Sequence, residues 1–160
     1  MLALTVWQPW ASLISSGHKA FEFRGWPMPA RARFQPVAIH AGARPVRLAE
    51  LRKLRFDLAT GHVTGIKPDA LPLIEQWCRE LEAKHQPLWL SSIVAVVKFG
   101  EPIRNAELEA RMGAPVLADS DREEHTLCGW PVLEVQAVSP PIPARGRQGF
   151  WRWDPPMELG

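Results

Sequence analysis

Three charged residues in close succession, Lys19, Glu22 and Arg24, are the side chains of this chain best suited to chemistry. They follow a segment that contains two tryptophans, Trp7 and Trp10. An unpaired charge among aromatic side chains is strongly unfavourable once it is buried. The three residues therefore form either a polar site in a cleft or a structural ion pair on a strand.

The spacing of these residues is compatible with several kinds of site. Glu22 and Arg24 are two positions apart, so on a strand they share a face and can pair. The arginine presents a planar fork that fits a phosphate or a carboxylate. Lys19 is a candidate phosphate clamp, general acid or base, or nucleophile, and in an enzyme Lys19 and Glu22 would be the catalytic residues. The structural alternative is a Glu22–Arg24 bridge that only closes one end of a barrel.

Aromatic side chains near this group suit the binding of nucleic-acid bases. Trp7, Trp10 and Trp26 could stack on bases, which contributes about 1–3 kcal/mol per base. The alternative is that they belong to the core, where a tryptophan buries a large area. We expect Trp10 in the core and Trp7 or Trp26 to be more exposed.

Four further polar residues are candidate nucleic-acid contacts. Gln8 is expected either to read a base edge or to cap a helix. His40 is expected either to donate into a cleft or to be a satisfied core residue. Arg145 and Arg147, near the end of the chain, are expected to contact phosphates.

Basic residues are concentrated in the first part of the chain. Residues 1–60 carry nine Lys or Arg and three Asp or Glu, whereas residues 61–144 carry seven and twelve. Fourteen of the nineteen basic residues are arginine, which binds phosphate through two nitrogens and stacks on bases. This pattern is typical of a nucleic-acid-binding protein, although a compositional bias of the genome would also supply arginines.

Hydrophobic periodicity and the positions of Gly and Pro predict short strands between helices of unequal length. Gly17 is expected to end the first helix, and the prolines after residue 139 are expected to break the strand before them. The predicted strands are Leu2–Val6, Ala20–Arg24, Pro36–His40, Ser92–Phe99 with a continuation toward Ile103, Trp130–Val138 and Gln148–Trp153. The predicted helices are Gln8–Ser16, Leu48–Leu58, Pro68–Lys84 and Asn105–Met112.

These elements do not alternate regularly, which argues against a parallel sheet of strand–helix–strand units. They indicate an α+β fold, a small mixed or antiparallel β-barrel flanked by helices. We expect one domain over residues 1–156 and a tail over residues 157–160. The chain has two cysteines and neither a long apolar span nor a signal-peptide pattern, so we expect a cytoplasmic protein that does not contact membranes.

The order of the motifs resembles a known family. The similarity is closest over residues 4–40, is limited to the order of elements over residues 45–125, and returns weakly near the C-terminus. The run Leu4-Thr5-Val6-Trp7-Gln8-Pro9-Trp10-Ala11-Ser12-Leu13, the pattern Gly17-x-Lys19-x-x-Glu22-x-Arg24, Trp26 and the strand Val37–His40 resemble the ASCH domain family of the PUA-like superfamily.

The resemblance implies a PUA-like barrel with the first helix beside a cleft that Lys19, Glu22 and Arg24 face. It implies that the partner is RNA, single-stranded DNA or a modified nucleoside, with RNA that is single-stranded or carries a modified base as the expected ligand. One bacterial branch of the family hydrolyses N4-acetylated cytidine with the motif lysine as nucleophile or base, but it has a threonine where this chain has Glu22. The alternative function is a hydrolase of an acylated pyrimidine nucleoside, or a ribonuclease, that uses Lys19 and Glu22.

No metal or cofactor is expected. His125 and Cys128, taken with Cys78 and His85, lack the paired spacing of a structural zinc site. The acidic run Asp119–Glu124 is expected to be a solvated loop rather than a cation site.

Overall fold

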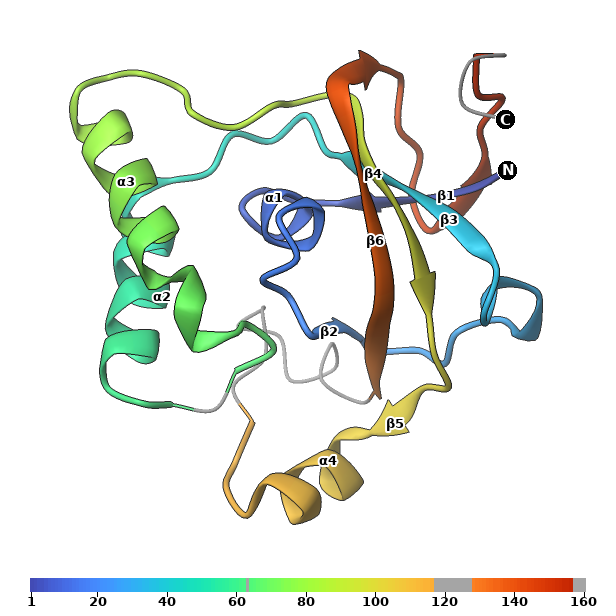
Figure 1. The fold of residues 1–160 in the computed structure, drawn as a ribbon, viewed down its shortest axis with the longest axis horizontal. Coiled ribbons are helices and arrows are strands. Elements are labelled where there is room, and N and C mark those ends of the chain that lie inside the picture. The colour runs from blue at the N-terminus through green and yellow to red at the C-terminus, as the bar shows by residue number, and fades with distance from the viewer. Residues whose placement is uncertain (63, 117–127, 157–160) are drawn as a thin grey trace.

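A computed structural model describes residues 1–62, 64–116 and 128–156, which form a curled mixed sheet with flanking helices (Figure 1). In the described ranges, no helix is long and apolar enough to cross a membrane. The strands are β1 (Leu2–Val6), β2 (Phe21–Arg24), β3 (Pro36–Ala41), β4 (Ser92–Phe99), β5 (Ile103–Arg104), β6 (Cys128–Pro143) and β7 (Phe150–Arg152). The helices are α1 (Trp10–Ser15), α2 (Leu48–Ala59), α3 (Leu71–Glu82) and α4 (Asn105–Met112), with short 3₁₀ turns at Ala30–Ala32 and Pro68–Ala70.

The sheet curls into half of a barrel. Its strand order is β2-β6-β4-β3-β1-β7, and β5 pairs with β6. β1 and β3 run parallel, whereas the other pairs are antiparallel. β2 and β7 stand at the two ends of this order, so the barrel is not closed by a backbone ladder between them. The predicted α+β fold with a mixed, barrel-like sheet is confirmed.

The prolines near the C-terminus do not break the strand before them, so this part of the prediction was wrong. β6 continues to Pro143, and Ile142 lies opposite Ile93 of β4. The register shifts before the next pair, Ala95 with Ala137, which makes an irregular, bulged stretch. Among the described strands, β4 is the one that pairs with this last part of β6. The edge of β6 that faces away from β4 forms no ladder there, so a proline, which has no N–H, interrupts none on that edge.

α1 is short and lies between the sheet and the pair formed by α2 and α3 (Figure 1). Its Ala11 and Ile14 pack into the core of the sheet, and its Leu13 packs into the core shared with α2 and α3. A helix that is apolar on opposite faces is buried on both. Gly17 ends α1 as predicted, with φ at +77° and its N–H bonded to the Ile14 carbonyl.

Aromatic side chains fill the interior of the half-barrel. Trp130 of β6 is fully buried. Its ring stacks on Phe150 of β7 at 5.9 Å and meets Phe99 and Trp26 edge-on at 5.8 and 4.9 Å. The cluster joins strands from both ends of the sheet order, which stabilises the curl.

This cluster predicts that Trp130→Ala lowers the free energy of unfolding by about 3–5 kcal/mol, because a large cavity replaces a buried ring. Trp89→Ala removes a tryptophan that is 59% exposed and should cost less than about 0.5 kcal/mol. Urea denaturation followed by circular dichroism measures both losses. Equal losses in the two variants would contradict the placement of Trp130 in the core.

Candidate functional site

The three charged residues of the motif, Lys19, Glu22 and Arg24 (the charged trio), come together at the edge of the sheet. Glu22 and Arg24 lie on β2, which pairs with β6 on one side. Lys19 precedes β2 and forms a single bridge with Ile66. The Nζ atom of Lys19 lies 3.4 Å from Glu22 Oε2 and donates a hydrogen bond to the Phe21 carbonyl at 2.7 Å. The turn after α1 therefore brings the lysine onto the carboxylate.

Arg24 connects this group to β1. Its Nε donates to Glu22 Oε1 at 2.9 Å, and its Nη2 donates to the carbonyl oxygen of Thr5 at 3.1 Å. β7 pairs with β1 only as far as Leu4 and Phe150, so the Thr5 carbonyl accepts from Arg24 instead of from a strand. The expected Glu22–Arg24 pair is present, and it bridges the gap between β2 and β1.

The charged trio is largely buried. The side chains of Lys19 and Glu22 are 0% and 4% exposed, whereas that of Arg24 is 25% exposed. Lys19 Nζ lies 5.5 Å from the ring centroids of Trp10 and Phe23, within the range of cation–π attraction. Arg24 is therefore the member of the trio that a ligand in solution meets first.

One oxygen of the Glu22 carboxylate can accept a further hydrogen bond. Oε1 accepts from Arg24, whereas the buried Oε2 forms an ion pair with Lys19 but accepts no hydrogen bond from the described residues. A carboxylate oxygen has room for more than one donor. Buried polar atoms are nearly always bonded, so an unfilled one calls for an explanation. A ligand N–H or O–H could supply the missing donor.

Gln8 is fully buried, and both ends of its amide are occupied. Nε2 donates to the Trp89 carbonyl at 2.7 Å, and Oε1 accepts from the N–H of Ser12 at 3.0 Å. The amide therefore holds the start of α1, as in the capping interpretation, and is not presented to a base.

The three tryptophans of the N-terminal part differ in environment. Trp7 is 56% exposed, as expected, and the Arg44 guanidinium lies 4.5 Å from its ring centroid. Trp10 packs against the two largest core clusters, as expected, and is half-buried there. Trp26 is half-buried and packs edge-on against Trp130. Trp7 is the one of the three that offers the most ring surface to a base.

Arg145 and Arg147 lie in the loop between β6 and β7, and both side chains are exposed. The Arg147 carbonyl accepts a hydrogen bond from Thr5 Oγ1 at 2.7 Å. Since the Thr5 carbonyl binds Arg24, one threonine joins the loop to the charged trio. The structure thus brings together basic residues from opposite ends of the chain.

His40 is buried beneath this loop. Its Nε2 donates to the Ala144 carbonyl at 2.9 Å, and its buried Nδ1 has no hydrogen-bond partner among the described residues. A Cβ on Gly146 would lie 2.3 Å from His40 Cε1, so the loop backbone rests directly on the ring. Burial lowers the pKa of His40, although the hydrogen bond to Ala144 acts in the opposite direction. His40 therefore holds the loop and does not point into a cleft.

The sequence did not predict two residues that lie near Trp7 and Gln8, namely Arg44 and Trp89. Arg44 contacts Trp7, and Trp89 is tied to the start of α1 by Gln8. Neither contact follows from local spacing. The available signal was a tryptophan in a proline-containing segment between a helix and a strand, which is typical of a loop, and loops often carry binding residues.

The described residues contain no group of three or more His, Cys, Asp or Glu that could hold a metal ion. The acidic run Asp119–Glu124, His125 and the expected tail at residues 157–160 lie outside the described residues. Two surface hollows, of about 400 and 420 Å³, lie away from the charged trio, one beside Phe34 and α4 and one along residues 86–90.

The Glu22–Arg24 bridge predicts that the two residues are coupled in stability. Arg24→Ala removes the hydrogen bonds to Glu22 and Thr5 and should lower the free energy of unfolding by about 2 kcal/mol. On a Glu22→Gln background the same change should cost clearly less, because it no longer removes a cation from a buried carboxylate. Urea unfolding of the double-mutant cycle measures the coupling. The exposed Arg31, in Arg31→Ala, serves as control, and additive losses at positions 22 and 24 would contradict the bridge.

The lowered pKa of His40 predicts that the protein loses stability at acidic pH. The unfolded chain binds a proton near the ordinary pKa of 6.5, whereas the folded chain does so only at lower pH. Below about pH 6.5 the unfolded state therefore binds more protons, so the free energy of unfolding falls as pH falls and is fully retained above that value. Chemical denaturation from about pH 7.5 to 5 should show a steeper fall in the wild type than in His40→Gln. The same pH dependence in both proteins would be the contrary result.

Comparison with known proteins identifies the fold. No protein-family profile matches the chain, and no curated protein matches it. Among solved structures, that of a mutant ZmASCH protein from Zymomonas mobilis matches 96% of this chain and 87% of its own, with a TM-score of 0.50 and 16% sequence identity. The expected resemblance is thereby confirmed for the architecture, a curled mixed sheet with flanking helices. The chain therefore shares its fold with this ASCH protein.

Proposed function

We propose that this protein binds RNA that is single-stranded or carries a modified base, and that the charged trio, on β2 and just before it, holds one base. The main support for the proposal is that the buried Oε2 of the Glu22 carboxylate accepts no hydrogen bond from the described residues. The ammonium group of Lys19 lies next to this oxygen, and it also lies over the rings of Trp10 and Phe23. A hydrogen-bond acceptor next to aromatic rings is the combination that recognises an unpaired base.

The unfilled oxygen of Glu22 fits the exocyclic amino group of a base. Carboxylates accept hydrogen bonds from the amino group of cytosine, whereas uracil presents a carbonyl oxygen at the equivalent position. Only a base that is unpaired and turned out of a stack can enter such a site, which favours single strands. Entry would open the side chains around Glu22, beginning at the partly exposed Arg24.

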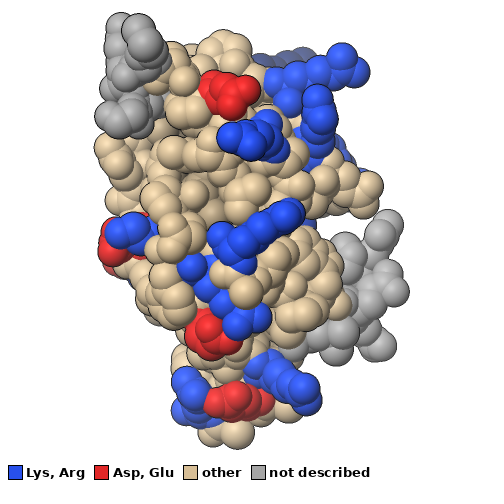
Figure 2. All heavy atoms as spheres, turned by 90° about the vertical axis from the view of Figure 1, so that its right-hand side faces the viewer, with Lys and Arg blue, Asp and Glu red and all other residues tan. Residues whose placement is uncertain are grey.

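Exposed basic side chains support an anionic ligand. The exposed Arg145 and Arg147 lie in a loop whose Arg147 carbonyl is joined to Arg24 through the two hydrogen bonds of Thr5. Basic side chains are also spread widely over the side of the molecule that carries both chain ends, with acidic ones at few points between them (Figure 2). Such a surface attracts a phosphate backbone.

The contact between Lys19 and Glu22 supports a second candidate, a hydrolase of an acylated pyrimidine nucleoside or a ribonuclease. With Nζ 3.4 Å from Oε2, one of the two groups could carry a proton while the other acts as base or nucleophile. The substrate would occupy the same site as the base of a bound RNA. The two candidates therefore differ in whether a product forms.

The proposal predicts a preference for cytosine that depends on Glu22. The wild type should bind a fluorescein-labelled cytosine-rich RNA about tenfold more tightly than a uracil-rich RNA of equal length, because a hydrogen bond to a charged acceptor contributes about 1.5–3 kcal/mol. Glu22→Gln should lose most of this preference. Glu134→Gln, an exposed acid of β6, is the matched control, and fluorescence anisotropy titrations measure the affinity of each protein for both strands.

Two results would contradict the proposal: no binding of any RNA or DNA pool at low salt, or an unchanged preference in Glu22→Gln. Conversion of N4-acetylcytidine to cytidine and acetate by the wild type, abolished in Lys19→Met, would support the hydrolase instead. Circular dichroism of Lys19→Met separates a loss of activity from a loss of fold, since Lys19 is buried.

A further inference from the structure

A second surface lies beside the charged trio, where four segments that are distant in the sequence meet. Its members are two exposed tryptophans and three arginines, none of them in the trio. The residues are Trp7, Arg44, Trp89, Arg145 and Arg147, here called the tryptophan–arginine surface.

The two tryptophans lie on neighbouring segments. Trp7 follows β1, and the hydrogen bond from Gln8 to the Trp89 carbonyl fixes the segment before β4 against the start of α1. Trp7 is 56% exposed and Trp89 is 59% exposed. Trp89 also borders the hollow of about 420 Å³ formed by residues 86–90. Large aromatic rings exposed on adjoining segments indicate a binding surface.

The arginine loop is fixed to the same place. The Ala144 N–H donates to the carbonyl of Ser91 at 2.9 Å, two residues after Trp89. At the other end of the loop, the Arg147 carbonyl accepts from Oγ1 of Thr5, which lies two residues before Trp7. The loop that carries Arg145 and Arg147 is therefore anchored beside both tryptophans.

The charge of the surface is positive. Arg44 and Arg47 share one carboxylate, Glu50, at 2.8 and 3.5 Å. Burial raises the pKa of Glu50, but the hydrogen bonds and charges of the two arginines outweigh it and hold this pKa below its ordinary value. Glu50 is thus charged and neutralises one of the two arginines. Arg145 and Arg147 form no ion pair with a residue that the structure describes.

We infer that the tryptophan–arginine surface is a second contact for a single-stranded nucleic acid, with Trp7 and Trp89 stacking on bases and Arg145 and Arg147 contacting phosphates. The inference rests on the proposed function for the class of ligand, but it uses no residue of the trio. Arg44 is a positioning residue, because its guanidinium lies against one face of the Trp7 ring and orders the side chain before a base arrives.

The chemistry of this surface suits the nucleotides that neighbour the base at Glu22, and not that base itself. Every base has a π-face, so stacking on tryptophan tolerates any sequence, and phosphate contacts carry no sequence information. The surface should therefore add affinity for longer strands without a preference among bases. The carboxylate of Glu22 would supply that preference at a separate place. The two contributions can be measured independently.

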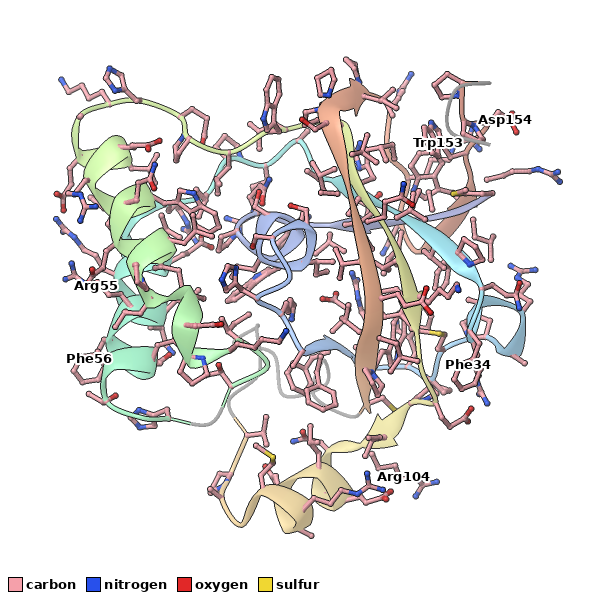
Figure 3. The ribbon with its side chains drawn as sticks, in the orientation of Figure 1. Phe34, Arg55, Phe56, Arg104, Trp153 and Asp154 are labelled. Atoms are coloured by element: carbon pink, nitrogen blue, oxygen red, sulfur yellow. The ribbon has the colours of Figure 1, made fainter. Side chains whose placement is uncertain are left out.

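The experiment compares anisotropy titrations of a short RNA, about four nucleotides, with those of a longer one, about twelve nucleotides. Trp7→Ala and Trp89→Ala should each weaken binding of the longer strand about tenfold, with the cytosine preference unchanged. The double variant Arg145→Ala/Arg147→Ala should reduce the slope of log binding constant against log salt concentration by about 0.7 for each phosphate that it no longer neutralises. Controls are Phe56→Ala and Arg55→Ala, because these side chains of α2, at the left of Figure 3, are exposed and belong neither to the trio nor to the tryptophan–arginine surface.

The outcomes separate this inference from the proposed function. Unchanged binding of the longer strand by both tryptophan variants would overturn the inference, even if Glu22→Gln still loses the cytosine preference. Weakened binding by the tryptophan variants would support it, even if Glu22→Gln behaves as wild type. If heparin competes as well as RNA and neither tryptophan variant affects RNA binding, the surface is only a polyanion site and the inference is wrong. Absence of any nucleic-acid binding by the wild type would overturn both.

Discussion

The side chain of Arg24 donates hydrogen bonds to the Glu22 carboxylate and to the Thr5 carbonyl and so joins β2 to β1. Among the described strands, no backbone pairing joins these two sides of the curled sheet. A side chain thus replaces the backbone ladder that closes a full barrel. The arrangement requires a charged glutamate inside the protein, and a buried carboxylate is tolerated only when cations and donors surround it. Lys19 and Arg24 meet that requirement. The same constraint that shapes the sheet therefore creates the chemistry of the site.

Thr5 extends this constraint to the surface of the molecule. Its carbonyl accepts from Arg24, and its hydroxyl donates to Arg147 and accepts from the Trp151 indole at 3.1 Å. The interior carboxylate and the exposed arginine loop are therefore placed by one residue of β1. A strand whose base enters beside Glu22 would leave its neighbouring phosphates near the loop. Base selection and backbone binding could in this way be assigned to adjacent but separate groups of side chains.

Much of this fold follows from local patterns, and the rest depends on tertiary contacts. The strands Leu2–Val6 and Ser92–Phe99 have the bounds predicted from their β-branched and alternating residues. The Glu22–Arg24 pair follows from a spacing of two on a strand. The length of β6 could not be predicted, because a proline ends a strand only where a neighbour needs its N–H. The position of Trp89 could not be predicted either, because it depends on a hydrogen bond between distant segments.

Nuclear magnetic resonance of the Arg24 Nε–H distinguishes a base bound at the trio from RNA bound elsewhere, because this group donates to Glu22 and borders the proposed base site. If the trio holds a base, titration with cytosine-rich single-stranded RNA should shift this resonance with the same dissociation constant as the one measured by anisotropy. The indole N–H of Trp10, whose ring lies 5.5 Å from Lys19 Nζ, should shift in parallel. An Arg24 resonance that stays unchanged while the arginines at positions 145 and 147 respond would show that RNA binds outside the trio and would contradict the account.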